Sequence, residues 1–121
     1  MARSPKITST DYPFLPVHVE VRGWKNKGSA LVDTGFTGEL VIPEHWLKKG
    51  IGTPDDYTDW GLANKSVVTA PTYAGSLKIV GLSITYDVLV VAIGDKLILG
   101  RGILDLFEVT FDRGEKLIVK P

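Results

Sequence analysis

Residues 30–38 read Ala-Leu-Val-Asp-Thr-Gly-Phe-Thr-Gly, and this stretch decides the fold. Asp33 stands where an apolar run meets a small hydroxyl residue and a glycine, a pattern typical of a strand that enters a tight turn. The carboxylate is therefore expected at the end of a buried strand, close to apolar side chains. A lone carboxylate in that position costs free energy unless it is paired. Two chains whose Asp33 carboxylates share one proton would remove that cost.

The segments on both sides of this stretch predict more strands. Val17, Val19 and Val21 alternate with polar residues, and a glycine-bounded turn over 23–28 leads into a strand over 29–33. Further strands are predicted at 40–42, 57–63, 66–70, 73–80, 82–93, 97–100, 108–112 and 115–120. The nearly continuous apolar run after Asp87 predicts a strand buried on both faces. Closely spaced short strands with glycine turns favour an all-β barrel or sandwich.

One or two short helices are expected among these strands. Pro43 suits the first turn of a helix over 44–49, which Gly50 would close. Residues 101–107 have helical spacing, with Ile103, Leu104 and Phe107 on one side.

The amino-acid composition argues against several classes of function. The 121 residues fit one domain, and 14 basic residues balance 14 acidic ones, so the basic surplus of a nucleic-acid-binding protein is missing. The absence of cysteine excludes disulfides and thiolate chemistry. The longest apolar run, residues 88–93, is far shorter than the roughly 20 residues that span a bilayer. With a polar segment over 1–16, a cytoplasmic protein without a membrane partner is expected. His18 and His45 lack metal-ligand spacing, so no metal or other cofactor is expected.

The Asp-Thr-Gly turn between two apolar strands, followed much later by Ile98-Leu99-Gly100 and a helix, resembles the retropepsin-like aspartic proteases. These are the single-domain relatives of pepsin, and Asp-Thr-Gly-Phe-Thr-Gly is more similar to the small prokaryotic members than to the viral enzymes. The resemblance covers about residues 17–112. It implies a closed β-barrel domain over 17–121, with 1–16 as an N-terminal extension that is a candidate for the dimer interface. It also implies a homodimer with one active site on its two-fold axis.

The resemblance also assigns roles to residues. Asp33 would be the catalytic acid, Thr34 would tie the two active-site loops together, and Gly35 would let the backbone approach and donate to the carboxylates. Ile98, Leu99 and Gly100 would support the loop. A flap would close over an extended peptide. The candidate residues of the cleft and flap are Phe36, Thr37, Gly38, Leu62, Ala63, Asn64 and Lys65.

The implied activity is that of an aspartic endopeptidase. Two neighbouring carboxylates cannot both ionise, so one acts as general base on a water molecule. The other keeps its proton, polarises the scissile carbonyl and helps to protonate the leaving amine.

The sequence departs from the family pattern at several points. Phe36 stands where relatives usually have Ala, Ser or Thr, so it would fill part of the cleft or the dimer contact. Thr37 replaces an acid that pairs with arginine in viral relatives, so Arg101 is expected to pair with Asp105. The flap tip lacks the glycines of viral enzymes.

Two other functions fit the same residues. A non-catalytic binding or assembly module would hold a peptide in the cleft or along a strand edge. A small β-barrel for a small ligand would use Asp33 only as a structural turn, in which the carboxylate accepts a hydrogen bond from its own backbone.

Overall fold

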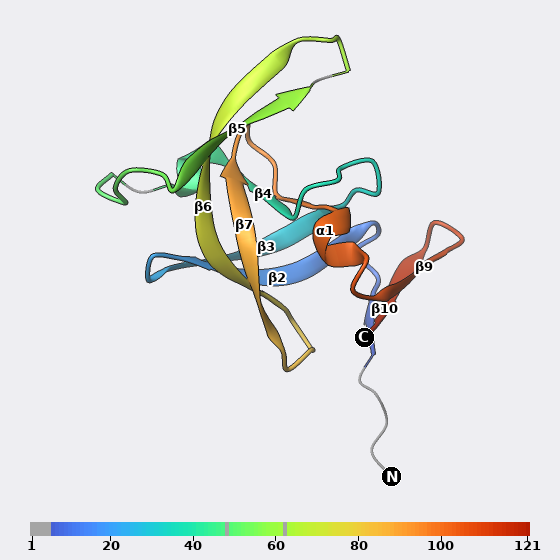
Figure 1. Ribbon diagram of the computed structural model, residues 1–121. Helices are drawn as coiled ribbons and strands as arrows, with labels where there is room; N and C mark the ends of the chain where they lie inside the picture. Colours follow the sequence, from blue (N-terminus) through green and yellow to red (C-terminus); the bar gives the residue numbers. More distant parts are fainter. Residues whose placement is uncertain (1–5, 48, 62) are drawn as a thin grey trace.

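A computed structural model describes residues 6–47, 49–61 and 63–121 (Figure 1). The strands are β1 (Ile7–Ser9), β2 (Phe14–Val21), β3 (Trp24–Val32), β4 (Leu40–Ile42), β5 (Asp56–Gly61), β6 (Val67–Ile79), β7 (Thr85–Ala92), β8 (Ile98–Leu99), β9 (Glu108–Asp112) and β10 (Lys116–Lys120). The short helices are the 3-10 helix η1 (Glu44–Trp46) and α1 (Arg101–Leu104). No helix in the described part is long and apolar enough to cross a membrane.

Six strands close into a barrel. They pair in the order β2-β3-β8-β4-β7-β6, and β6 returns to β2, where Val17 lies opposite Ile79. β5 pairs with β6 outside this ring, so the β5–β6 hairpin projects beyond the barrel (Figure 1). β1, β10 and β9 form a separate antiparallel sheet. The closed barrel decides between the two predicted architectures, barrel and sandwich.

The barrel interior is filled by aliphatic side chains. On β2, the buried residues Leu15, Val17, Val19 and Val21 alternate with outward-facing ones, because successive side chains of a strand point to opposite faces. The largest fully buried side chains are those of Leu15, Leu40, Ile42, Leu77, Ile79, Leu99, Leu117, Val17, Val21, Val90 and Val119. The core therefore joins the barrel to the small sheet through β10.

The expected turn over 23–28 was wrong. Arg22 and Gly23, with φ of 51° and 80°, make the whole turn, and β3 begins at Trp24. Lys25 and Lys27 are exposed and alternate with less exposed residues. Their polarity concealed the strand, because only one face of this part of β3 is covered.

β6 and β7 also differ from the expected strands. The segments predicted at 66–70 and 73–80 form one strand, and Pro71 does not interrupt it but lies opposite Tyr57 of β5. β7 begins at Thr85 rather than at residue 82. Its last three residues are buried, but Leu89 is 55% exposed, so burial on both faces holds only for the end of the strand.

Both helices are shorter than expected. The helix predicted over 44–49 is a 3-10 turn that ends at Trp46, because Leu47 is extended; Lys48 lies outside the described residues. α1 ends at Leu104 instead of residue 107. Ile103 and Leu104 are buried, and Phe107 packs edge-on against Tyr86 at 5.5 Å between ring centroids.

Residues 1–16 were expected as an N-terminal extension. The described part of this segment, from residue 6, contributes strands to both sheets. β1 pairs with β10, with Ile7 opposite Val119, and β2 begins at Phe14. The Ser9 hydroxyl donates a hydrogen bond of 2.6 Å to the Phe14 carbonyl and holds the turn between the two strands.

Asp55 fixes the loop that leads into β5. Its carboxylate accepts hydrogen bonds from the Ala74 backbone N–H at 2.8 Å and from the Arg22 guanidinium at 3.3 Å. The bond from Ala74, followed by the charge of Arg22, holds the pKa of the Asp55 carboxyl below its ordinary value. Because the folded-state pKa is lowered, this stabilisation is present at neutral pH and is lost as acid protonates the group.

Candidate active site

Asp33 follows β3 directly, and β8 holds it in place. Leu31 and Val32 pair in parallel with Ile98 and Leu99. The Asp33 backbone N–H donates to the Leu99 carbonyl at 3.0 Å. The position of the acid is therefore set by the backbone of a strand distant in the sequence.

The carboxylate of Asp33 turns back on its own loop. Its Oδ1 accepts the Gly35 backbone N–H at 2.9 Å, and Oδ2 makes no hydrogen bond with any described residue. Asp33 is half-buried, while Thr34, Gly35 and Thr37 are exposed. The contact to Gly35 fits both a catalytic acid held by its loop and the structural-turn alternative. The unengaged Oδ2 leaves one oxygen able to take part in chemistry.

Gly100 holds the candidate active-site loop, residues 33–38, against α1. Its N–H donates to the Glu39 carbonyl at 2.9 Å, and the next N–H, of Arg101, donates to the Phe36 carbonyl at 2.8 Å. A Cβ atom on Gly100 would overlap the Gly38 carbonyl oxygen and lie 2.9 Å from that of Phe36. Only glycine permits this approach, because the opposing atoms belong to the backbone. The structure thus places Ile98, Leu99 and Gly100 beside the loop.

The residues expected to form a flap lie at the tip of the β5–β6 hairpin, which is called the flap below. Leu62 lies outside the described residues, whereas Ala63, Asn64 and Lys65 form an exposed tip. Within this tip, Lys65 has a positive φ, at 67°. Asn64 uses its side chain: Oδ1 accepts the Ser66 N–H at 3.1 Å and the Ser66 hydroxyl at 2.6 Å. This side-chain turn takes the place of a glycine tip.

Phe36 joins the loop to the flap. Its ring lies 5.0 Å from that of Trp60 on β5, tilted by 55°. Both rings pack over Gly38, where a Cβ atom would lie 2.7 Å from Trp60. Phe36 thus fills space between residues 33–38 and the β5–β6 hairpin.

A hollow of 280 Å³, here called the flap hollow, opens beside this aromatic pair. Its lining is mainly apolar and consists of Phe36, Val41, Trp60, Gly61, Val91, Ile93, Gly94, Asp95, Lys96 and Ile98. The Trp60 Nε1 is buried and has no hydrogen-bond partner among the described residues.

The sequence alone did not place Trp60 beside Phe36. One signal was available: Thr58 and Trp60 alternate with exposed residues on β5, so they share one face of the flap.

Phe36→Ala is expected to lower the free energy of unfolding by about 2 kcal/mol, because it removes the ring that packs on Trp60. Urea denaturation measures the change. Tyr57→Ala is the matched control, since Tyr57 is 60% exposed on β5, the strand that carries Trp60. This variant should change the free energy of unfolding by less than about 0.5 kcal/mol. Equal losses in both variants would contradict the packing role of Phe36.

Thr34 lies on a second face, next to α1 and β9. Arg101 pairs with Asp105 at 3.4 Å, as the sequence predicted. A hollow of 220 Å³, here called the α1 hollow, is lined by Val32, Thr34, Arg101, Leu104, Asp105, Phe107, Val109 and Phe111. Leu106 and Phe111 are 55% and 41% exposed. Apolar side chains and the Arg101–Asp105 pair therefore share the lining of the α1 hollow beside Thr34.

No protein-family model and no curated protein matches the sequence. Among solved structures, the chain is similar to a retropepsin-like aspartic protease from Rickettsia conorii, with 16% identity and a TM-score of 0.60 over 99% of this chain and 96% of that one. It is also similar to the simian foamy virus (mac) protease, with 21% identity and a TM-score of 0.51 over 74% of this chain and 91% of that one. At sequence identities this low, the similarity is evidence for the fold only. The chain has the retropepsin-like fold.

Proposed function

We propose that this protein is an aspartic endopeptidase that acts as a homodimer. The observation that carries the proposal is the placement of Asp33: it ends a barrel strand, is fixed by β8, and belongs to a loop that an aromatic pair joins to a flap. This placement occurs within a fold shared with aspartic proteases. It suits an acid that acts on an extended peptide lying between loop and flap.

One such acid is not enough for the chemistry, because a base and a proton donor are both needed. A two-fold axis near Thr34 would bring a second Asp33 to the same site and allow the pair to hold a single proton. The exposed Phe111, which lines the α1 hollow, would supply apolar surface near that axis, and the exposed Leu106 would add to it. β9 is an edge strand of its sheet, with β10 as its partner there, so its other side is available to a second copy.

In the proposed reaction, the ionised Asp33 takes a proton from a water molecule, whose oxygen attacks the scissile carbonyl carbon. The protonated Asp33 of the other chain gives its proton to the carbonyl oxygen. In the resulting diol, proton transfer to the amide nitrogen breaks the carbon–nitrogen bond and releases an amine and a carboxylic acid. The flap hollow, beside Phe36 and Trp60, would receive an apolar side chain of the peptide.

A peptide-library digest analysed by mass spectrometry tests the proposal. The full chain at high concentration, between pH 4 and pH 7, should cleave extended peptides next to apolar residues. No cleavage of any peptide in the library, together with saturable peptide binding, would favour the non-catalytic binding module. One observation favours that alternative: Phe36 and Trp60 already occupy space between loop and flap.

Hydrolysis should depend on the square of protein concentration below the dimer dissociation constant, because only the dimer is active. Phe111→Glu should weaken the dimer at least about ten-fold by placing a charge in an apolar contact. Sedimentation velocity and specific activity measured over a dilution series check both statements. Ile84→Glu is the control, since Ile84 is 49% exposed but does not line the α1 hollow. A stable monomer with full specific activity would contradict the dimer.

A further inference from the structure

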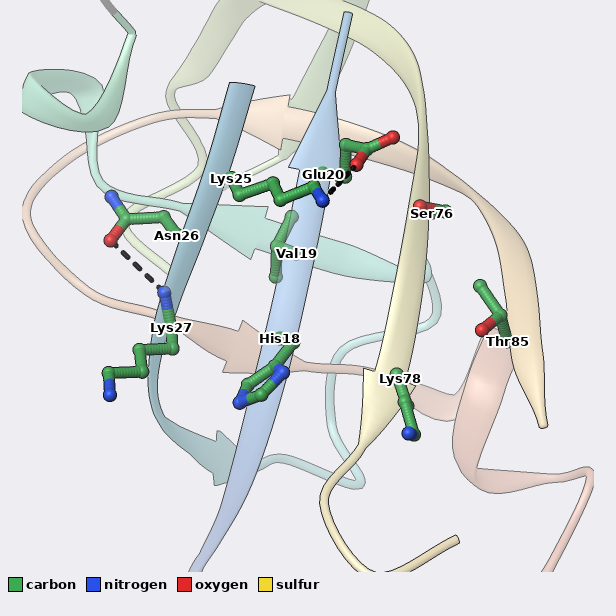
Figure 2. Close-up of a pocket in the computed structure, with 9 residues that line it drawn as sticks. All are labelled: His18, Val19, Glu20, Lys25, Asn26, Lys27, Ser76, Lys78 and Thr85. Carbon is green, nitrogen blue, oxygen red and sulfur yellow. Dashed lines mark hydrogen bonds and ion pairs between the residues drawn. The ribbon is translucent and has the colours of Figure 1, made fainter. Parts of the chain in front are cut away.

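The outer surface of the barrel has a hollow far larger than the flap hollow. Its volume is 690 Å³, against 280 Å³ beside Phe36 and Trp60. Figure 2 shows its lining, which comes from four strands, β2, β3, β6 and β7: His18, Val19, Glu20, Lys25, Asn26, Lys27, Ser76, Lys78 and Thr85. None of these residues belongs to the active-site loop or the flap tip. This feature is called the outer hollow below.

Three basic side chains form a row across the outer hollow. His18 on β2 lies directly opposite Lys27 on β3 and directly opposite Lys78 on β6. Figure 2 shows the two lysines on either side of His18. Neighbouring strands are about 4.8 Å apart, so the row spans about 10 Å. Lys27 and Lys78 therefore lie two strands apart, one on each side of His18.

The charges around this row do not balance. Lys25 pairs with Glu20 at 3.8 Å, which compensates one lysine. In the described part of the chain, no carboxylate lies within ion-pairing distance of Lys27 or Lys78; that includes Asp87, the other acid on this face, which lies opposite Ser76. Neither Lys27 nor Lys78 therefore has an ion-pair partner among the described residues.

The remaining polar groups of the outer hollow are suited to donate hydrogen bonds. The Asn26 Oδ1 accepts the backbone N–H of Lys27 at 3.0 Å, which leaves the amide NH₂ to donate. Ser76 and Thr85 contribute hydroxyls, each able to donate one hydrogen bond. The lining thus combines uncompensated cations with neutral donors.

We propose that the outer hollow binds a small molecule that carries a phosphate group. The phosphate lies over His18 between Lys27 and Lys78, and its polar remainder contacts Asn26, Ser76 and Thr85. A phosphate ester carries a charge of about −1.5 to −2 at pH 7, which matches two uncompensated lysines, whereas a carboxylate carries only one charge. The volume of the outer hollow falls in the range typical of small-molecule sites.

Amide NMR titration of the full chain tests this site at constant ionic strength. Glycerol 3-phosphate and inorganic phosphate are the probes, and acetate is the monoanion control. The amide signals of His18, Lys27 and Lys78 should shift and saturate with phosphate probes and not with acetate. Tighter binding of glycerol 3-phosphate assigns the site to phosphate esters, and equal affinities assign it to free phosphate. Lack of saturation, or equal shifts with acetate, would overturn the proposal.

Matched variants separate the site from general charge effects. Lys27→Gln and Lys78→Gln should each weaken binding about five-fold, whereas Lys120→Gln, an exposed lysine on β10, should leave it unchanged. Equal weakening by Lys120→Gln would overturn the site. The titration can be run on Asp33→Asn protein, so its outcome does not depend on hydrolysis.

Discussion

Asp33→Asn is expected to lower the rate of peptide hydrolysis at least about 10⁴-fold, while the protein stays folded and self-associated. Asparagine keeps the shape of aspartate, and its Oδ1 can still accept the Gly35 N–H that the Asp33 carboxylate accepts at 2.9 Å. An amide cannot take a proton from water or hold one for the leaving group. The change therefore removes the chemistry and preserves the loop.

Initial rates on a peptide found in the library digest measure this effect, with melting temperature and sedimentation as checks on folding and assembly. Asp59→Asn is the matched control, because the Asp59 carboxylate also accepts one hydrogen bond, from the Thr69 hydroxyl, but lies on the flap. It should keep most of the activity. If the Asp33→Asn protein cleaves as fast as the parent, Asp33 is not the base and the proposed mechanism is wrong.

Gly100→Ala should lower the free energy of unfolding by about 3 kcal/mol. The added methyl group would overlap the Gly38 carbonyl oxygen, and neither that atom nor the nearby Phe36 carbonyl can rotate away as a side chain does. Relief requires the loop to separate from α1. Urea denaturation reports the loss of stability, and activity should fall with it because the same loop carries Asp33.

Gly61→Ala is the control for this prediction. Gly61 has nothing within 4 Å of an added Cβ atom and no positive φ, so alanine should change stability by less than about 0.5 kcal/mol or raise it slightly. If Gly100→Ala proves as harmless as Gly61→Ala, the loop does not depend on close backbone contact at this point.

The sequence predicts the framework around Asp33 well. Residues 30–38 end a strand in a turn, as the apolar run before Asp-Thr-Gly predicts. The packing of the distant segment 98–100 beside them was implied only by the family resemblance. The pairing of Arg101 with Asp105 follows from helical spacing alone. Both the strand end at Asp33 and the Arg101–Asp105 pair depend on residues that are close together in the sequence.

The long strands are harder to predict. β3 includes Lys25 and Lys27, and β6 passes through Pro71, so composition suggested a loop in one case and a break in the other. In both, pairing with neighbouring strands outweighed local preference. The contact of Phe36 with Trp60 depends on how the flap lies over the loop, and no local pattern encodes that tertiary geometry.

The continuity of β6 determines how this flap can move. Thr72 pairs with Asp56 in the hairpin and with Val91 in the barrel, so no loose connection separates the two ladders on this side. Thr72 also shares a hydrogen bond of 2.8 Å with the Thr58 hydroxyl. The hairpin is therefore attached to the barrel through an unbroken strand, β6. Opening of the hairpin would therefore require β6 itself to bend, because no loop interrupts this strand between the hairpin and the barrel.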